Sequence, residues 1–222
     1  MDIIEAMRRR MSVRGYKKDQ VPREVLEGII EIARRSPSAL NTQPWEITIV
    51  AGDILDRIRE ANVEMLASGV ASKTDIMHGN FEGIYKQRQV DTAVQIFQLM
   101  GIAREDKEKR AEWTQKGFRF FDAPAAIILS TESSLEESRT QFDLGLLTQT
   151  ICLAALNYGL GTCIERQGIM YADVVRRFTG IPESQRISVA IAIGYPDADF
   201  PANKLETKRE SVENITTWFG FD

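Results

Sequence analysis

The residues best suited to chemistry lie near the start of the chain, in the run Arg10-Met11-Ser12-Val13-Arg14. A guanidinium is a planar, permanently charged donor that matches phosphate oxygens, and Ser12 adds a hydroxyl between Arg10 and Arg14. The run therefore predicts an anion site that accepts a phosphate group. A solvated basic face at a helix end is the alternative interpretation, and a charge run alone favours it.

A second stretch, residues 36–45, reads Ser-Pro-Ser-Ala-Leu-Asn-Thr-Gln-Pro-Trp. Pro37 and Pro44 fix φ and remove two backbone donors, while serine and asparagine favour bonds from side chain to backbone. Binding groups are commonly placed on such loops between rigid elements. We therefore expect a binding turn here, with an ordinary helix-to-strand connection as the alternative.

Protein nucleophiles and metal ligands are scarce. The sequence has one histidine, His78, and two cysteines, Cys152 and Cys163, without CxxC spacing. This argues against a zinc site of the usual type and against a histidine-based triad. No GxGxxG motif follows an expected strand, so no dedicated dinucleotide fold is indicated. We expect a bound cofactor to carry any chemistry.

Composition indicates one globular domain over residues 1–222, with 43% hydrophobic and 27% charged residues. A net charge of -4 argues against a general nucleic-acid binder. No apolar stretch reaches membrane-spanning length, and the N-terminus lacks a secretory pattern. We expect a cytoplasmic protein that binds neither nucleic acid nor membrane.

Hydrophobic periodicity predicts the elements that must position these residues. We expect helices at 3–11, 21–35, 54–66, 134–155 and 169–179, and strands at 46–51, 123–130, 162–164 and 187–193. Asp53 is expected to cap the third helix, Ser134 and Glu137 to form a capping box, and Gly159 or Gly161 to supply a left-handed cap. Residues 67–121 are expected as a helical lid insertion, and residues 197–222 as a C-terminal arm.

Four ordered motifs carry a resemblance to a known family. They are residues 10–14, residues 36–45, Gly159-Leu-Gly-Thr-Cys163, and Gly194-Tyr-Pro196 followed by Lys208-Arg209. In order and separation they resemble the FMN-dependent nitroreductase family over nearly the whole chain. Residues 86–124 are most similar to the branch of nitrobenzoate and related nitroaromatic reductases.

This resemblance implies an α+β fold, with a central mixed β-sheet wrapped by helices. It also implies an intertwined homodimer that binds one FMN in each of two interface clefts, with the C-terminal arm over the partner. Trp218 and Phe221 would then gain a surface to bury against.

The resemblance implies which residues bind FMN. Arg10 and Arg209 are expected at the phosphate, Arg14 at the ribityl chain and pyrimidine edge, and the loop at Pro37 on the flavin of the other subunit. Backbone N–H groups of residues 164–166 are expected near flavin N5, although the family's glycine-rich turn is replaced there. Met11 stands where the family has Arg or His, so it is expected to contact FMN through its backbone. The implied cofactor-binding residues are Arg10, Met11, Ser12, Arg14, Pro37, Ser38, Ala39, Asn41, Ile164, Glu165, Arg166 and Arg209.

The implied activity is ping-pong reduction of nitroaromatic compounds by NADH or NADPH, with no catalytic side chain because flavin N5 carries the chemistry. Tyr85, Lys86 and Arg88 on the lid are candidate substrate-binding residues for a carboxylated acceptor such as nitrobenzoate, with solvated surface charges as the alternative for the two cations. Reductive dehalogenation, alkene or quinone reduction, and flavin destruction are alternative reactions on the same scaffold. A further alternative is a flavin-binding protein without catalytic activity.

Overall fold

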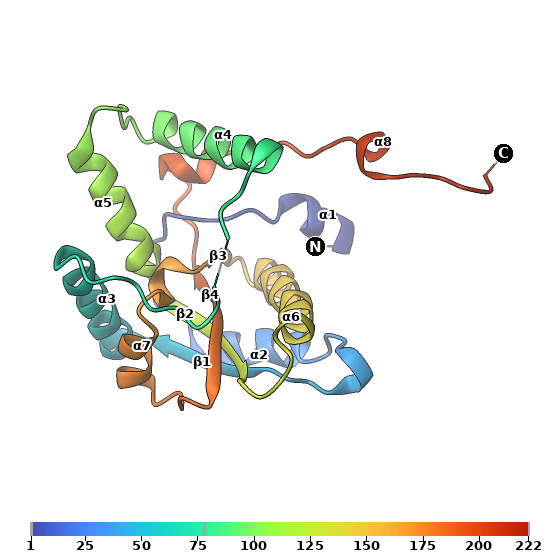
Figure 1. Ribbon diagram of the computed structural model, residues 1–222, viewed down its shortest axis with the longest axis horizontal. Coiled ribbons are helices and arrows are strands. Elements are labelled where there is room, and N and C mark those ends of the chain that lie inside the picture. The colour runs from blue at the N-terminus through green and yellow to red at the C-terminus, as the bar shows by residue number, and fades with distance from the viewer. Residues whose placement is uncertain (1, 78, 222) are drawn as a thin grey trace.

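The computed structural model describes residues 2–77 and 79–221 and places the strands and helices as drawn in Figure 1. The strands are β1 (Glu46–Ala51), β2 (Ala125–Glu132), β3 (Gly161–Glu165) and β4 (Gln185–Gly194). The α-helices are α1 (Ile3–Arg9), α2 (Arg23–Ala33), α3 (Gly52–Ala67), α4 (Gly83–Leu99), α5 (Lys107–Phe118), α6 (Glu137–Asn157), α7 (Ala172–Thr179) and α8 (Val212–Ile215). Short 3-10 helices include η1 (Ala39–Asn41), η2 (Phe120–Asp122), η3 (Gln167–Ile169) and η4 (Pro201–Lys204).

The strands form one sheet in the order β1-β2-β4-β3, and each neighbouring pair is antiparallel. The expected α+β fold with a central sheet is confirmed. The expectation of a mixed sheet is wrong for these strands. Parallel pairing occurs only as isolated bridges among the described residues, one of which joins Ser12 to Thr162.

Both faces of the sheet are buried, because successive side chains of a strand point to opposite faces and those of the central strands are apolar on both. Ile127 and Leu129 of β2 pack with α2 and α6 on one face, whereas Ala126 and Ile128 pack with α3 and α7 on the other. Figure 1 shows these helices on the two sides of the sheet. The strand expected at 123–130 is therefore confirmed as β2, and it is a buried central strand of the sheet.

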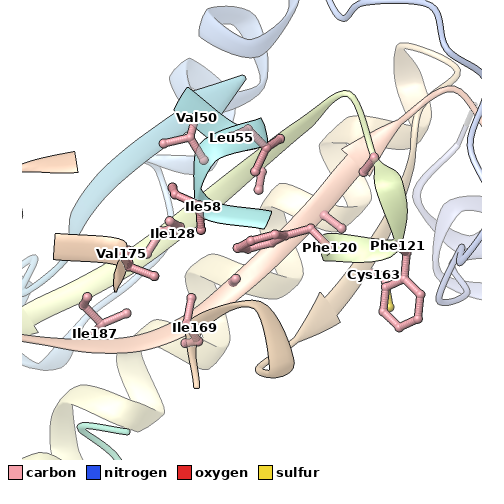
Figure 2. Packing of buried hydrophobic residues seen from close by; sticks show 14 of the residues in the cluster. Val50, Leu55, Ile58, Phe120, Phe121, Ile128, Cys163, Ile169, Val175 and Ile187 are labelled. Atoms are coloured by element: carbon pink, nitrogen blue, oxygen red, sulfur yellow. The ribbon is translucent and has the colours of Figure 1, made fainter. Parts of the chain in front are cut away.

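One aromatic side chain fills the face that α3 and α7 cover. Phe120 is fully buried, and Figure 2 shows it among Leu55, Ile58 and Ile169. Phe120, Phe121 and Asp122 all have φ between 53° and 57°, a left-handed conformation that side chains rarely adopt. Burial of the ring stabilises this strained turn, so the end of the 67–121 segment belongs to the core.

Ile76, Ile96 and Phe118 of that segment are buried as well, whereas most of α4 and the end of the chain are exposed. In Figure 1, α4 lies along one side of the protein away from the sheet, and the segment with α8 leaves the body of the molecule. Trp218, Phe219 and Phe221 are 62%, 84% and 76% exposed. The division into a domain, a lid at 67–121 and an arm at 197–222 stays a prediction.

Several local expectations are wrong. Asp53 does not cap α3, because the helix starts at Gly52 with Ala51 as its N-cap residue. The capping box from Ser134 to Glu137 does not form either, because α6 begins at Glu137. The residue before Ser134 is held by a backbone bond to Ser184, so tertiary contacts fix this loop. Of the two glycines considered at the end of α6, Gly159 is the left-handed one, with φ +72°.

The difference in burial between two isoleucines of α3 predicts different losses of stability when each is replaced by alanine. Ile58 is fully buried, whereas Ile54 is 39% exposed. We expect Ile58→Ala to lower the free energy of unfolding by about 2–5 kcal/mol, because it leaves a cavity between α3 and the sheet. Urea unfolding should show a loss below about 1 kcal/mol for the control Ile54→Ala. Equal losses for the two variants would contradict this packing.

Candidate functional site

The N-terminal motif lies beside the sheet. After α1, the chain runs extended along β3, where the backbone N–H of Val13 donates to the carbonyl of Thr162 at 2.9 Å. Ser12 itself forms a parallel bridge with Thr162 of β3. Because β3 belongs to the sheet, this strand fixes where the arginines on either side of Ser12 emerge.

Asn203 of η4 holds the same motif from the other side. Its Oδ1 accepts from the backbone N–H groups of Arg14 at 2.7 Å and Gly15 at 3.2 Å, and its Nδ2 donates to the carbonyls of Gly15 and Asp197, both at 2.8 Å. One side chain thus joins the start of the chain to its last fifth. Sequence reasoning missed Asn203, because an isolated asparagine in a loop gives no local signal.

These tethers create a basic pocket of about 320 Å³ between residues 10–14 and the segment after η4. We call it the basic pocket. Its lining residues are Arg10, Met11, Ser12, Arg14, Thr92, Leu205, Thr207, Lys208 and Arg209. The structure therefore brings together the first predicted motif and the late basic pair, which are almost 200 positions apart in the sequence. Thr92, Leu205 and Thr207 were not predicted from the sequence.

The electrostatics of the basic pocket favour an anion. Arg10, Arg14, Lys208 and Arg209 line it, and within the described part of the chain none of them forms a salt bridge. Arg209 instead donates to the hydroxyl of Thr207 at 2.7 Å. Like charges held close together are destabilising unless an anion joins them. The pocket thus suits a group with two negative charges, such as a phosphate monoester.

The second predicted motif forms a separate site. The backbone N–H of Ala39 donates to the buried carboxylate of Asp143 at 3.2 Å, and the hydroxyl of Ser38 accepts from the backbone of Gln43 at 2.9 Å. Leu40, like Asn41, has a left-handed backbone and is 94% exposed. This strained loop is thus held rigidly and presents an apolar side chain to the surroundings.

A pocket of about 490 Å³ lies between this loop and α6. Its lining residues are Pro37, Ser38, Ala39, Arg139, Phe142, Asp143 and Leu146. It shares no lining residue with the basic pocket in the described structure. Within one chain, the structure does not bring residues 37–41 together with the arginines of the first motif.

The third predicted group lies at the end of β3. Ile164 is 40% exposed, whereas the side chain of Glu165 is buried and points into the fold. Burial raises the pKa of Glu165 to about 8. Burial also lowers the pKa of Arg166, and Glu137 opposes that shift. The expected role of residues 164–166 concerns their backbone, and it stays a prediction.

The expected substrate-binding residues lie on α4, and two of them contact each other. The guanidinium of Arg88 donates to Glu210 at 2.6 Å and lies 5.8 Å from the ring centroid of Tyr85. Lys86 donates to Gln89 at 3.0 Å. Arg88 also lines a groove of about 680 Å³ that shares Thr92, Thr207, Lys208 and Arg209 with the basic pocket. Of the three, Arg88 is the one that lines this groove.

Thiol chemistry has no support at this site. Cys152 and Cys163 are both buried and free, and burial raises the pKa of Cys163 to about 12. His78 lies outside the described residues. Among those described, no group of three or more His, Cys, Asp or Glu side chains is placed to hold a metal, and no helix has the length and apolar character to cross a membrane.

Comparison with known proteins identifies the family. Residues 7–195 match the model of the nitroreductase family. The chain is 30% identical over 221 residues to nitroreductase NfnB of Mycolicibacterium smegmatis, covering 97% of this chain and 94% of that protein. It is 30% identical over 223 residues to 4-nitrobenzoate reductase of Pseudomonas putida, covering 100% and 96%.

The fold agrees. The crystal structure of FMN and NADPH-dependent nitroreductase NfnB from sphigopyxis sp. strain HMH superposes with a TM-score of 0.95 at 28% identity, over the whole of both chains. A more distant relative, iodotyrosine deiodinase 1 of Mus musculus, is 27% identical over 225 residues and is covered to 68% of its length. This protein belongs to the nitroreductase family, and the resemblance drawn from the four motifs is confirmed.

The tethering by Asn203 is testable. We expect Asn203→Ala to lower the free energy of unfolding by about 2–4 kcal/mol, because it leaves the partly buried backbone N–H groups of Arg14 and Gly15 without their acceptor. Chemical denaturation measures this loss. Asn214→Ala is the matched control, because Asn214 is exposed and donates only to Glu210, at 3.0 Å. A loss no larger than that of the control would contradict the tether.

Proposed function

We propose that this protein is an FMN-dependent NAD(P)H oxidoreductase that reduces nitroaromatic compounds. The observation that carries the proposal is the basic pocket, in which four cations without carboxylate partners gather in a nitroreductase fold. Relatives named nitroreductase and 4-nitrobenzoate reductase match over almost their full length, which supports the same reaction class here.

The residues present fit FMN. Arg10, Ser12, Lys208 and Arg209 would hold the phosphate through charge-assisted bonds, and Arg14 would lie toward the pyrimidine edge, where a cation stabilises negative charge. Bound FMN supplies hydride-transfer chemistry that protein side chains do not provide. The buried, protonated cysteines agree with a site in which the protein binds, orients and polarises.

A homodimer completes the proposed site. Residues 37–41 would reach the flavin of the partner subunit, which fits the separation of their pocket from the basic pocket within one chain. The exposed Trp218 and Phe221 at the end of the chain would pack on the partner, because isolated apolar surface of this size needs a cover. The proposed partners are thus a second copy of this chain and a small aromatic acceptor, in the cytoplasm where NAD(P)H is supplied.

The proposed acceptor is a planar nitroaromatic compound, including carboxylated ones such as nitrobenzoate. NAD(P)H and the acceptor would use one site in turn, which gives ping-pong kinetics and parallel steady-state lines. Arg88 is the best candidate to pair with a substrate carboxylate, because it lines the groove beside the basic pocket. Tyr85 stacks on Arg88 and would orient it, whereas Lys86 would contribute only if α4 turned toward the substrate.

The function is tested by anaerobic absorbance spectroscopy of the purified protein. We expect flavin bands that NADH or NADPH bleaches and that 4-nitrobenzoate restores, because one site serves both half-reactions. Bands that bleach but return only with a halophenol would favour reductive dehalogenation. A yellow protein that neither nucleotide bleaches would indicate a flavin-binding protein without this activity.

Substitutions in the basic pocket test which residues bind FMN. Arg209→Ala should weaken FMN binding by about 10- to 100-fold, since one charge-assisted bond is lost. Arg8→Ala is the matched control, because Arg8 is an exposed arginine of α1 that does not line the pocket. A colourless wild-type protein that cannot be reconstituted with FMN would overturn the cofactor assignment.

The role of Arg88 predicts a selective kinetic effect. We expect Arg88→Ala to raise KM for 4-nitrobenzoate by about 5- to 20-fold, because a charge pair with the substrate is lost, and to leave KM for nitrobenzene unchanged. Lys86→Ala should change neither value. Steady-state assays with the two acceptors measure this. A parallel rise for both acceptors would show that Arg88 only positions α4 through Glu210.

A further inference from the structure

Glu165 is a buried acid beside the candidate site. It is the last residue of β3, and its exposed fraction is 8%. Three positions earlier on the same strand, Thr162 forms a bridge with Ser12 of the basic pocket. The carboxyl group therefore lies beneath the strand that fixes the first motif, and the proposed mechanism gives it no task.

The carboxyl group of Glu165 shapes the turn that follows β3. Its Oε2 accepts from the backbone N–H of Gly168 at 2.9 Å. The carbonyl of Gly168 accepts from Asn62 of α3 at 2.8 Å. A Cβ on Gly168 would lie 2.5 Å from the Phe120 ring and 2.7 Å from Oε1 of Glu165, so only glycine fits this approach. The turn is held from the strand, from α3 and from η2 at once.

No charged partner balances Glu165. It forms no salt bridge with the described residues, and its Oε1, like Oδ1 of Asn62, is buried without a hydrogen-bond partner. The side chains that contact the same turn at Gly168, Asn62 and Phe120, are neutral. Its titratable neighbours are Cys163 and Tyr16, which are both acids.

Those two neighbours are uncharged, because burial raises the pKa of Cys163 to about 12 and raises the pKa of Tyr16 well above its ordinary value. Arg14 is the nearby cation, and it acts on Tyr16 and Cys163. A lone carboxylate in such surroundings would be strongly destabilised, whereas a neutral carboxylic acid is destabilised far less.

We propose that Glu165 is held as a neutral acid, and that in this form it positions the backbone of residues 164–166 against the flavin ring. The second half of this statement rests on the proposed function, whereas the first half stands on the burial and contacts of Glu165. A proton on the carboxyl group keeps negative charge away from the ring, which itself gains negative charge on reduction. Glu165 is thus a positioning residue that also sets the pH range of the site.

The pKa of about 8 agrees with this geometry, since burial raises it and the bonds from Gly168 and Gln167 only partly oppose the rise. An acid whose pKa is higher in the folded than in the unfolded protein contributes stability that is complete below the unfolded pKa, about 4.5. That contribution falls as the pH rises and is lost once the pH passes about 8.

The neutral state is tested by thermal unfolding of the wild type and of Glu165→Gln, which keeps the acceptor for Gly168 and cannot ionise. From about pH 5.5 to about pH 8.5, Tm of the wild type should fall by about 5 °C or more relative to that of the variant. Glu183→Gln, at an exposed glutamate in the loop before β4, should follow the wild type. Parallel profiles of the wild type and Glu165→Gln would overturn the proposal.

A second measurement needs no folded variant. Infrared spectra of the wild type should contain a protonated-carboxyl band at about pH 6.5, where exposed carboxylates are ionised, and lose it by about pH 9.5. Absence of this band at the lower pH would overturn the neutral state even if Glu165→Gln failed to fold.

The positioning role is tested on the FMN-loaded protein. Above about pH 8, the flavin midpoint potential of the wild type should fall below that of Glu165→Gln, because ionised Glu165 opposes negative charge on the ring. Equal potentials at all pH values would overturn the positioning role and leave the proposed function intact. If the wild type did not bind FMN but its Tm still fell with pH as expected, the proposed function would be overturned and the neutral state of Glu165 would stand.

Discussion

The structure depends on the pairing of β2 with β4 at the centre of a sheet whose two faces are both covered by helices. Apolar side chains alternate on these strands, so α2 and α6 can cover one face while α3 and α7 cover the other. β3 is fixed by its ladder to β4, and the chain at Val13 is fixed by β3. The basic pocket is thus positioned by strands whose own stability comes from burial, at one edge of the sheet.

Two groups near β3 lower the stability of the fold, and they lie in different places. On the pocket side, four cations lie together without carboxylate partners, and on the core side Glu165 lies without a cation. No salt bridge joins the two groups within the described residues. Uncompensated charge on one side and an uncharged acid on the other are typical of functional sites, where local stability is given up for electrostatics.

The sequence predicted features that local pattern controls. The apolar run at 123–130 forms β2. Arg10 and Arg14 line one pocket with Lys208 and Arg209, as the family motifs implied. Features that depend on distant contacts were missed. Asn203 gives no local signal, Ser134 has the right spacing for a cap but is in a loop tied to Ser184, and Phe120 adopts a left-handed backbone because its ring has a place in the core. The antiparallel order of the sheet is likewise set by pairings between strands far apart in the sequence.

The distance along the chain between the two halves of the basic pocket has a consequence for biosynthesis. Its first group of residues ends at Arg14 and, apart from Thr92, the rest of its lining begins at Leu205. During translation, at about 5–20 residues per second, the N-terminal arginines must wait for roughly ten seconds or more before their counterparts are made. The pocket therefore cannot form until Arg209 has been made, so no ligand can be captured there earlier in synthesis.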